Sequence, residues 1–248
     1  MIETGYKSDK GLTRDHNEDA FVVVPEQNVF VVADGVGGAN AGEVASSTAV
    51  SDLEALLESD PITGYTDDRL GDYMKKCIDS INNDVFDKSV ASAERNGMAT
   101  TLVICHVRGT KAYTVNVGDS RAYLKRGGQL YQLTEDHTYV QSLVRLGVIT
   151  RDEAKVHTKG HYITRAMGAE ENVEADYYQT ELEEGDVIIL CTDGLYNEVS
   201  EERINQMINT AAGMQDLAER MVDEANLSGG SDNITVICIK YEGGPHEQ

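Results

Sequence analysis

Four apolar stretches of the chain each place an aspartate beside the end of an expected strand. These are VFVVADGVGG (29–38) with Asp34, VIILCTDGL (187–195) with Asp193, YTVNVGDSR (113–121) with Asp119, and GGSDNITVICI (229–239) with Asp232. A single Asp-Gly pair after a strand is most simply a turn. Four such acids, three of them next to a glycine, need a common explanation.

If these acids converge, their carboxylates repel one another, and they stay ionised together at neutral pH only with cations between them. The glycines let backbone carbonyls and a substrate approach such cations because they carry no Cβ. All-oxygen ligands favour Mg²⁺ or Mn²⁺ over Zn²⁺. The one close histidine pair, His157 and His161, is expected on the surface. The acids therefore predict a site for hard divalent cations.

A further acidic element, RDHNEDAF (14–21), leads into another apolar run. Arg14 with Glu18 and Asp19 fits a surface ion pair at helical spacing, worth about 0.3–0.5 kcal/mol. The same residues also fit a phosphate site, because a guanidinium binds two phosphate oxygens while nearby cations bind the others. The spacing alone does not choose between these interpretations.

The composition excludes several classes of protein. Among 248 residues, 43 are acidic and 21 are basic, a formal net charge of −22. Such a surface repels a phosphate backbone, so nucleic acid is not an expected partner. No apolar run approaches the ~20 residues of a membrane span and no signal peptide is evident, so we expect a cytoplasmic protein without a membrane partner. The widely spaced Cys77, Cys105, Cys191 and Cys238 argue against a disulfide framework.

Short apolar runs and helical periodicities indicate an α+β fold. Strands are expected at 20–24, 28–33, 101–107, 111–117, 121–125, 129–133, 186–191 and 234–240, and helices at 41–57, 69–86, 201–211 and 214–226. Because helices come in pairs between groups of closely spaced strands, we predict packed antiparallel sheets with helical layers outside. No linker is evident, so residues 1–248 are expected to form one domain, with a partly irregular flap at about 138–165.

Eight short motifs together resemble a known family. They are SDKG..RDHNED (8–19), VVADGVGG (31–38), MATTL (98–102), VGDSRAY (117–123), LTEDHT (133–138), ITRAMG (163–168), LCTDGL (190–195) and SDNITV (231–236). A single piece such as TDGL is a weak signal, but eight in this order over nearly the whole chain are a strong one. The chain is similar to the protein phosphatase type 2C family in its bacterial form.

This resemblance implies a metal-dependent serine/threonine phosphoprotein phosphatase. The implied fold is a central sandwich of two antiparallel β-sheets flanked on both sides by pairs of α-helices. The implied cofactor is Mn²⁺ or Mg²⁺, with two core ions and a third, weaker one, and a hydroxide bridging the core ions attacks phosphorus in line. The implied partners are phosphorylated Ser/Thr proteins, including a cognate Ser/Thr kinase, and we expect a monomer.

The resemblance also assigns a role to each residue that matches a family motif. For the two core ions, the resemblance implies that Asp34 bridges them, that the Gly35 carbonyl binds one, and that Asp193 and Asp232 hold the other. It implies that Glu18 and Asp19 act through metal-bound water and that Asp119 joins Asp193 at the third ion. It also implies that Arg14 binds the substrate phosphate and that Asn233 supports Asp232. These assignments are the predicted site.

One position departs from the pattern of eukaryotic family members, which have DGHGG in the second motif and use its histidine as a general acid. Val36 stands at that position here, as bacterial members often lack the histidine. The resemblance therefore leaves the proton donor open. Water on the third ion, held by Asp119, is our first candidate, and His137 is the second.

Other phosphate-binding classes lack their motifs in this chain. No cysteine is followed six residues later by arginine, as cysteine-dependent phosphatases require, and no GxxxxGK[ST] loop occurs. Residues 29–57 have the order of a dinucleotide-binding module, because an expected strand is followed by GVGGANAG and then by an expected helix. However, Asn40 stands where the third glycine should be, and Asp34 would repel a pyrophosphate. The remaining alternative is a non-catalytic phosphatase-fold module for binding or sensing.

Overall fold

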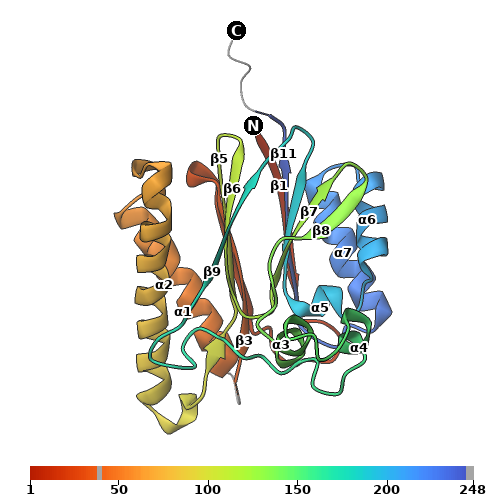
Figure 1. The fold of residues 1–248 in the computed structure, drawn as a ribbon. Coiled ribbons are helices and arrows are strands. Elements are labelled where there is room, and N and C mark those ends of the chain that lie inside the picture. The colour runs from red at the N-terminus through yellow and green to blue at the C-terminus, as the bar shows by residue number, and fades with distance from the viewer. Residues whose placement is uncertain (38–40, 244–248) are drawn as a thin grey trace.

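Two antiparallel sheets stand face to face at the centre of the molecule (Figure 1). The computed structural model describes residues 1–37 and 41–243. The first sheet has the order β1 (Ile2–Asp9), β11 (Ile234–Tyr241), β10 (Val187–Cys191), β7 (Arg121–Arg126) and β8 (Gln129–Gln132). The second has the order β2 (Asp19–Val24), β3 (Val29–Val36), β5 (Leu102–Arg108), β6 (Lys111–Val117) and β9 (Asp176–Glu181), and β4 (Ala99–Thr100) pairs with β3.

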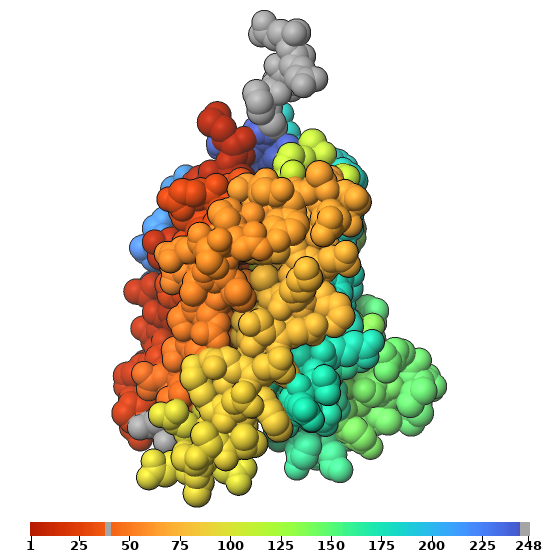
Figure 2. Space-filling model, turned by 90° about the vertical axis from the view of Figure 1, so that its left-hand side faces the viewer, coloured from red at the N-terminus to blue at the C-terminus, as the bar shows by residue number. Residues whose placement is uncertain are grey.

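A pair of helices covers the outer face of each sheet. The helices α1 (Ala41–Ser59) and α2 (Asp67–Val90) pack on the second sheet and form the face seen in Figure 2. The first sheet is covered by α6 (Glu201–Thr210) and α7 (Met214–Ser228), with the short α5 (Asp193–Tyr196) after β10. The predicted sandwich of two antiparallel sheets between helical pairs is confirmed.

Strand β3 shows why its sequence is apolar without alternation. Phe30 and Val32 lie in the core between the two sheets, whereas Val31 and Ala33 pack toward α1 and α2. Both faces of the strand are therefore buried, and both demand apolar side chains. The strand can become polar only where it leaves the core, which is at Asp34.

The eight predicted strands and four predicted long helices are present, with ends that differ by a few residues. Local sequence patterns did not predict β1, β4, β9, α4 and α5. Strand β1, IETGYKSD, is a polar edge strand, and its Gly5 lies against the backbone of α7. Strand β9 alternates half-buried and exposed residues within an acidic stretch that looked only solvated. Both edges are held by pairing with β11 and β6, which local sequence does not reveal.

The flap expected at about 138–165 contains two short helices, α3 (Tyr139–Arg145) and α4 (Arg151–Lys155). Thr150 and Glu153 form a capping box at the start of α4. A single bridge between Thr138 and Ile163 closes the base of the segment. No helix within residues 1–37 and 41–243 is long and apolar enough to cross a membrane.

Antiparallel pairing explains how the acids can gather. The end of β10 at Cys191 pairs with the start of β7 at Arg121 and lies next to the start of β11. The strand ends next to these three acids therefore lie at the same end of the sandwich. Asp193 follows the end of β10, and Asp119 and Asp232 precede the starts of β7 and β11.

Candidate metal and phosphate site

The second sheet brings Asp19 and Asp34 together as direct partners across β2 and β3. Thr101 fixes the backbone of Asp34 on the other side, because its N–H donates to the Asp34 carbonyl (2.9 Å) and its hydroxyl accepts from the Asp34 N–H (2.9 Å). The backbone positions of both acids are thus fixed by strand pairing at the end of a buried strand.

Asp19 joins the two sheets at this point. Its Oδ2 accepts hydrogen bonds from the hydroxyls of Thr192 (2.9 Å) and Thr235 (2.7 Å), which belong to the β10 and β11 ends of the first sheet. Both threonines are fully buried. The sequence did not predict them, because a threonine beside an Asp-Gly pair resembles an ordinary turn residue and a threonine within an expected strand resembles an ordinary strand residue. Only their burial marks them as part of the site.

Asp193 and Asp232 are held close by a tight backbone contact. A Cβ on Gly194 would lie 2.0 Å from the carbonyl oxygen of Asn233, so only glycine lets the two segments approach this closely. Asn197, one turn later in the chain, donates from Nδ2 to Oδ2 of Asp193 (3.0 Å). The glycine after the acid therefore serves packing at this site.

Asn233 organises the loop that carries Arg14. Its Oδ1 accepts from the N–H of Glu18 (2.8 Å), and its Nδ2 donates to the carbonyls of Lys10 and His16 (2.8 Å each). Its own N–H donates to Oδ1 of Asp232 (2.8 Å). The backbone of Asn233 thus contacts Asp232, while its side chain fixes the 10–18 loop.

Arg14 lies in an exposed loop and pairs with Asp232, not with Glu18 (2.7 Å, Nη2 to Oδ2). The segment is not helical, so the alternative of an ion pair at helical spacing is wrong. The carbonyl of Glu18 accepts from the N–H of Gly35 (3.1 Å) and from the hydroxyl of Ser46 (2.6 Å), which fixes its backbone beside the strand end.

Gly35 sits in a space that no larger residue could occupy. A Cβ there would lie 2.1 Å from the Gly42 carbonyl oxygen and 2.6 Å from that of Glu18. Backbone oxygens therefore crowd around the residue that follows Asp34. Gly38 and Asn40, which belong to the predicted second motif and to the dinucleotide alternative, lie outside the described residues.

The electrostatics show how unfavourable this gathering is without cations. Burial, and then the carboxylates of Asp19, Asp193, Asp119 and Asp232, raise the pKa of Asp34 well above its usual value. Burial is also the largest cause that raises the pKa of Asp19 to about 7, of Asp193 to about 6 and of Asp119 to about 7. Acids that oppose one another's ionisation are a common property of metal and catalytic sites.

The residues fit hard divalent cations, although they do not form a closed cage. Within the described parts of the chain, no three Asp, Glu, His or Cys side chains are arranged to hold an ion as they stand. The buried Oδ1 atoms of Asp19 and Asp193 have no hydrogen-bond partner there. Such atoms need a cation, a proton or water. Oxygen-only donors favour Mg²⁺ or Mn²⁺, and the positive charge that one of these acids, Asp232, meets here is the Arg14 guanidinium.

Comparison with known proteins agrees with this geometry. The family model described as Protein phosphatase 2C matches residues 12–228. The chain belongs to the protein phosphatase 2C family. The serine/threonine phosphatase stp of Listeria monocytogenes serotype 4b is 36% identical over 241 residues, which cover 96% of this chain and 95% of that protein. The family and enzyme class that the motifs predicted are confirmed.

Solved phosphatase 2C structures share the fold over nearly the whole chain. Stp1 from Staphylococcus aureus superposes with a TM-score of 0.92 at 32% identity, covering 98% of this chain and 96% of that one. The catalytic domain of the serine/threonine phosphatase PstP, in complex with two manganese ions, superposes with a TM-score of 0.84 at 33% identity, covering 96% and 97%.

In this phosphatase 2C chain, neither Val36 nor His137 resembles a general acid. Val36 pairs with Ala99 at the end of β3 and carries no titratable group. Nδ1 of His137 accepts from the N–H of Gly118 (3.1 Å), and Nε2 lies 3.2 Å from Asp176. Because both ring nitrogens are engaged, His137 orients the Asp119 loop and does not face the other acids.

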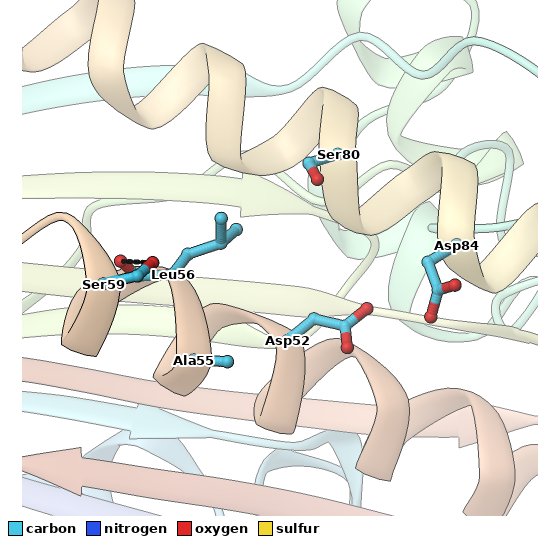
Figure 3. A pocket seen from close by; sticks show the side chains of 6 residues that line it. All are labelled: Asp52, Ala55, Leu56, Ser59, Ser80 and Asp84. Carbon is cyan, nitrogen blue, oxygen red and sulfur yellow. Dashed lines mark hydrogen bonds between the residues drawn. The ribbon is translucent and has the colours of Figure 1, made fainter.

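A groove of about 370 Å³ between α1 and α2 lies apart from these acids (Figure 3). Asp52 and Asp84 face each other across it. Burial and the neighbouring Asp84 raise the pKa of Asp52. Asp52 lies about three helical turns beyond the start of α1, so it is not part of the strand-end site.

Proposed function

We propose that this phosphatase hydrolyses phosphoserine and phosphothreonine in proteins with Mn²⁺ or Mg²⁺, using two core ions and a third, weaker one. The observation that carries the proposal is the gathering of Asp34, Asp193 and Asp232 beside Arg14, where the buried Oδ1 of Asp193 has no hydrogen-bond partner within residues 1–37 and 41–243. The two manganese ions of PstP support the choice of metal.

The chain's own residues would divide the work. Bound cations supply positive charge to the phosphate and acidify the water between them. Asp34, the Gly35 carbonyl, Asp193 and Asp232 would hold the cations. Asp19, whose Oδ2 is fixed by two threonine hydroxyls, keeps Oδ1 available to orient water, with Glu18 beside it.

Arg14 would bind the phosphate, and Asp119 would hold the third ion together with Asp193. The Arg14 loop is exposed, as a residue that meets a protein substrate must be. Once cations neutralise Asp232, the Arg14 fork is free to bind two phosphate oxygens. Asn233 would fix the position of this loop relative to Asp232 through its four hydrogen bonds.

The test is release of phosphate from a phosphothreonine peptide at increasing Mn²⁺, with Asp34→Asn as the matched variant. We expect hydrolysis that requires Mn²⁺ and a loss on the order of a thousandfold in the variant. A folded protein that binds Mn²⁺ and the phosphopeptide without releasing phosphate would contradict the proposal. That result would favour the non-catalytic binding module.

We propose further that residues 1–248 act as one catalytic domain and as a monomer in the bacterial cytoplasm, on phosphoproteins that include a cognate Ser/Thr kinase. The four cysteines are all free and buried, which suits a reducing compartment. Exposed apolar side chains on the flap, such as Leu146 and Val148, suit contact with a protein substrate. Sedimentation of the pure protein and dephosphorylation of an autophosphorylated kinase test these statements.

A further inference from the structure

A tyrosine on α5 links two of the acids in a way that the family motifs do not describe. Tyr196 follows Asp193 by three residues on the same short helix. Its hydroxyl donates a hydrogen bond of 3.0 Å to the backbone carbonyl of Asp119. The helix that begins at Asp193 therefore also carries the group that holds the Asp119 backbone.

The ring of Tyr196 is itself fixed from behind. The guanidinium carbon of Arg121 lies 3.5 Å from the centre of the ring, which is a close cation–π contact. Asp136 holds Arg121 through Nε and Nη2, at 3.0 Å and 2.7 Å. The hydroxyl of Tyr123 accepts from Nη1 of Arg121 (2.8 Å). The tyrosine hydroxyl thus has little freedom to move away from Asp119.

The neighbouring residue Gly118 is held from the opposite side. Its carbonyl accepts from the backbone N–H of His137 (2.9 Å), and its N–H donates to Nδ1 of the same residue (3.1 Å). At Gly118 φ is +106°, and a Cβ would lie 2.6 Å from a side-chain carbon of Thr101. The segment around Asp119 is therefore held at several points, and Tyr196 provides a direct contact between the Asp119 backbone and the helix that begins at Asp193.

We propose that Tyr196 is a positioning residue that fixes the Asp119 backbone relative to Asp193 and thereby sets the affinity for the weakest cation. The inference rests on the proposed function, in which these two acids share the third ion. Their carboxyls fit that role: Asp119 is 5% exposed, and Oδ1 of Asp193 has no partner among the described residues. Asp193 would serve a core site as well, but the hydroxyl of Tyr196 bonds to the Asp119 side of this pair.

The test compares Mn²⁺ binding to the whole protein and to Tyr196→Phe by isothermal titration calorimetry. We expect the weakest class of site to lose about fivefold to tenfold in affinity, because one hydrogen bond that fixes the ligand is removed. The tight class should be unchanged. Tyr123→Phe is the matched control, since it also removes a hydroxyl bonded to this network but leaves the contact with Asp119 intact.

A second measurement does not depend on cations. Hydrogen exchange of the metal-free protein should be faster around residues 118–120 in Tyr196→Phe and unchanged in β7. An unchanged weak site, unchanged exchange in this segment, or an equal loss in Tyr123→Phe would overturn the inference. A wild-type protein that binds only two ions would also overturn it, while Mn²⁺-dependent hydrolysis in that protein would leave the proposed hydrolysis at the two core ions standing.

Discussion

Nη2 of Arg14 lies 2.7 Å from Oδ2 of Asp232, although 218 positions separate the two residues in the chain. The guanidinium therefore neutralises one acid of the crowded group. Both side chains are partly open to solvent, at 47% and 30% exposure, so this pair is a weak and replaceable contact. In the proposed function, Asp232 would hold a cation instead, and Arg14 would then be free to contact the phosphate.

The first prediction concerns Arg14, which pairs with Asp232 here and would bind the substrate phosphate in the proposed function. Arg14→Ala should raise KM for a phosphothreonine peptide about tenfold or more, because a charged, two-pronged contact to phosphate is lost. Its affinity for Mn²⁺ should be equal or tighter, because the competing guanidinium is gone. Steady-state kinetics and calorimetry measure the two effects. Arg203→Ala, which breaks an exposed pair with Glu224, should leave both values unchanged, and a weaker affinity for Mn²⁺ in Arg14→Ala would contradict the exchange.

The second prediction concerns Gly35. Gly35→Ala should destabilise the fold by about 3 kcal/mol or more, since its Cβ would meet the backbone of Gly42 at 2.1 Å and no flexible side chain can move aside. Mn²⁺ should then no longer raise the melting temperature. Gly71→Ala is the control, because that glycine lies within α2 with no atom near its Cβ position, and it should stabilise by up to about 1 kcal/mol. A melting temperature of Gly35→Ala close to that of the wild type would contradict the prediction, because it would show that the backbone of Gly42 can move away from an added Cβ.

Much of the site could be predicted from the sequence because its acids stand at strand ends with glycines beside them. Asp34 is the first polar residue within the apolar strand β3, and Asp193 follows the buried strand β10 after one threonine, so local patterns report both acids directly. The partners of these acids could not be predicted in the same way. Thr192 and Thr235 donate hydrogen bonds to Asp19 from segments that are distant in sequence. The hydroxyl of Tyr196 likewise donates to the backbone carbonyl of Asp119. Such contacts depend on tertiary packing.

The same limit applies to the fold. Central strands such as β3 are recognisable because burial on both faces demands apolar residues throughout. The edge strands β1 and β9 have one partner each and a half-exposed composition, so their sequences resemble polar loops. They become strands because β11 and β6 offer free hydrogen-bonding edges.

The third prediction concerns the electrostatic cost of Asp34. Asp34→Asn should raise the melting temperature of the protein without added cations by about 2–4 °C at neutral pH, because burial and then the neighbouring carboxylates oppose ionisation of Asp34 in the fold, a cost that asparagine does not carry. It should also abolish stabilisation by Mn²⁺. Thermal melts with and without Mn²⁺ measure both effects. Asp223→Asn, at an exposed position of α7, should change neither, and a destabilised Asp34→Asn protein would show that the repulsion is already relieved.

The fourth prediction is a pH dependence far from the acids. His106 on β5 is only 2% exposed, and burial lowers its pKa below the usual 6.5. The unfolded chain therefore takes up a proton as the pH falls through about 6.5, while the folded protein does not, so stability decreases there. His106→Phe should flatten the curve of unfolding free energy between about pH 6.5 and pH 5, measured with urea. His161→Gln, at an exposed flap position, should leave the slope as it is, and an equal slope in His106→Phe would exclude His106 as its source.

The last prediction concerns the proton for the leaving oxygen, which neither Val36 nor His137 can supply from its place. A seryl oxygen needs a proton as it leaves, whereas p-nitrophenolate leaves without one. If Asp119 supports the donor, Asp119→Ala at saturating Mn²⁺ should lose at least tenfold more kcat on a phosphoserine peptide than on p-nitrophenyl phosphate, with an altered basic limb of the pH–rate profile for the peptide alone. His137→Gln should lower kcat on both substrates by a similar factor, because His137 holds Gly118 by its Nδ1 and acts through position. Equal losses on the two substrates in Asp119→Ala would assign Asp119 to cation binding and remove it from proton transfer.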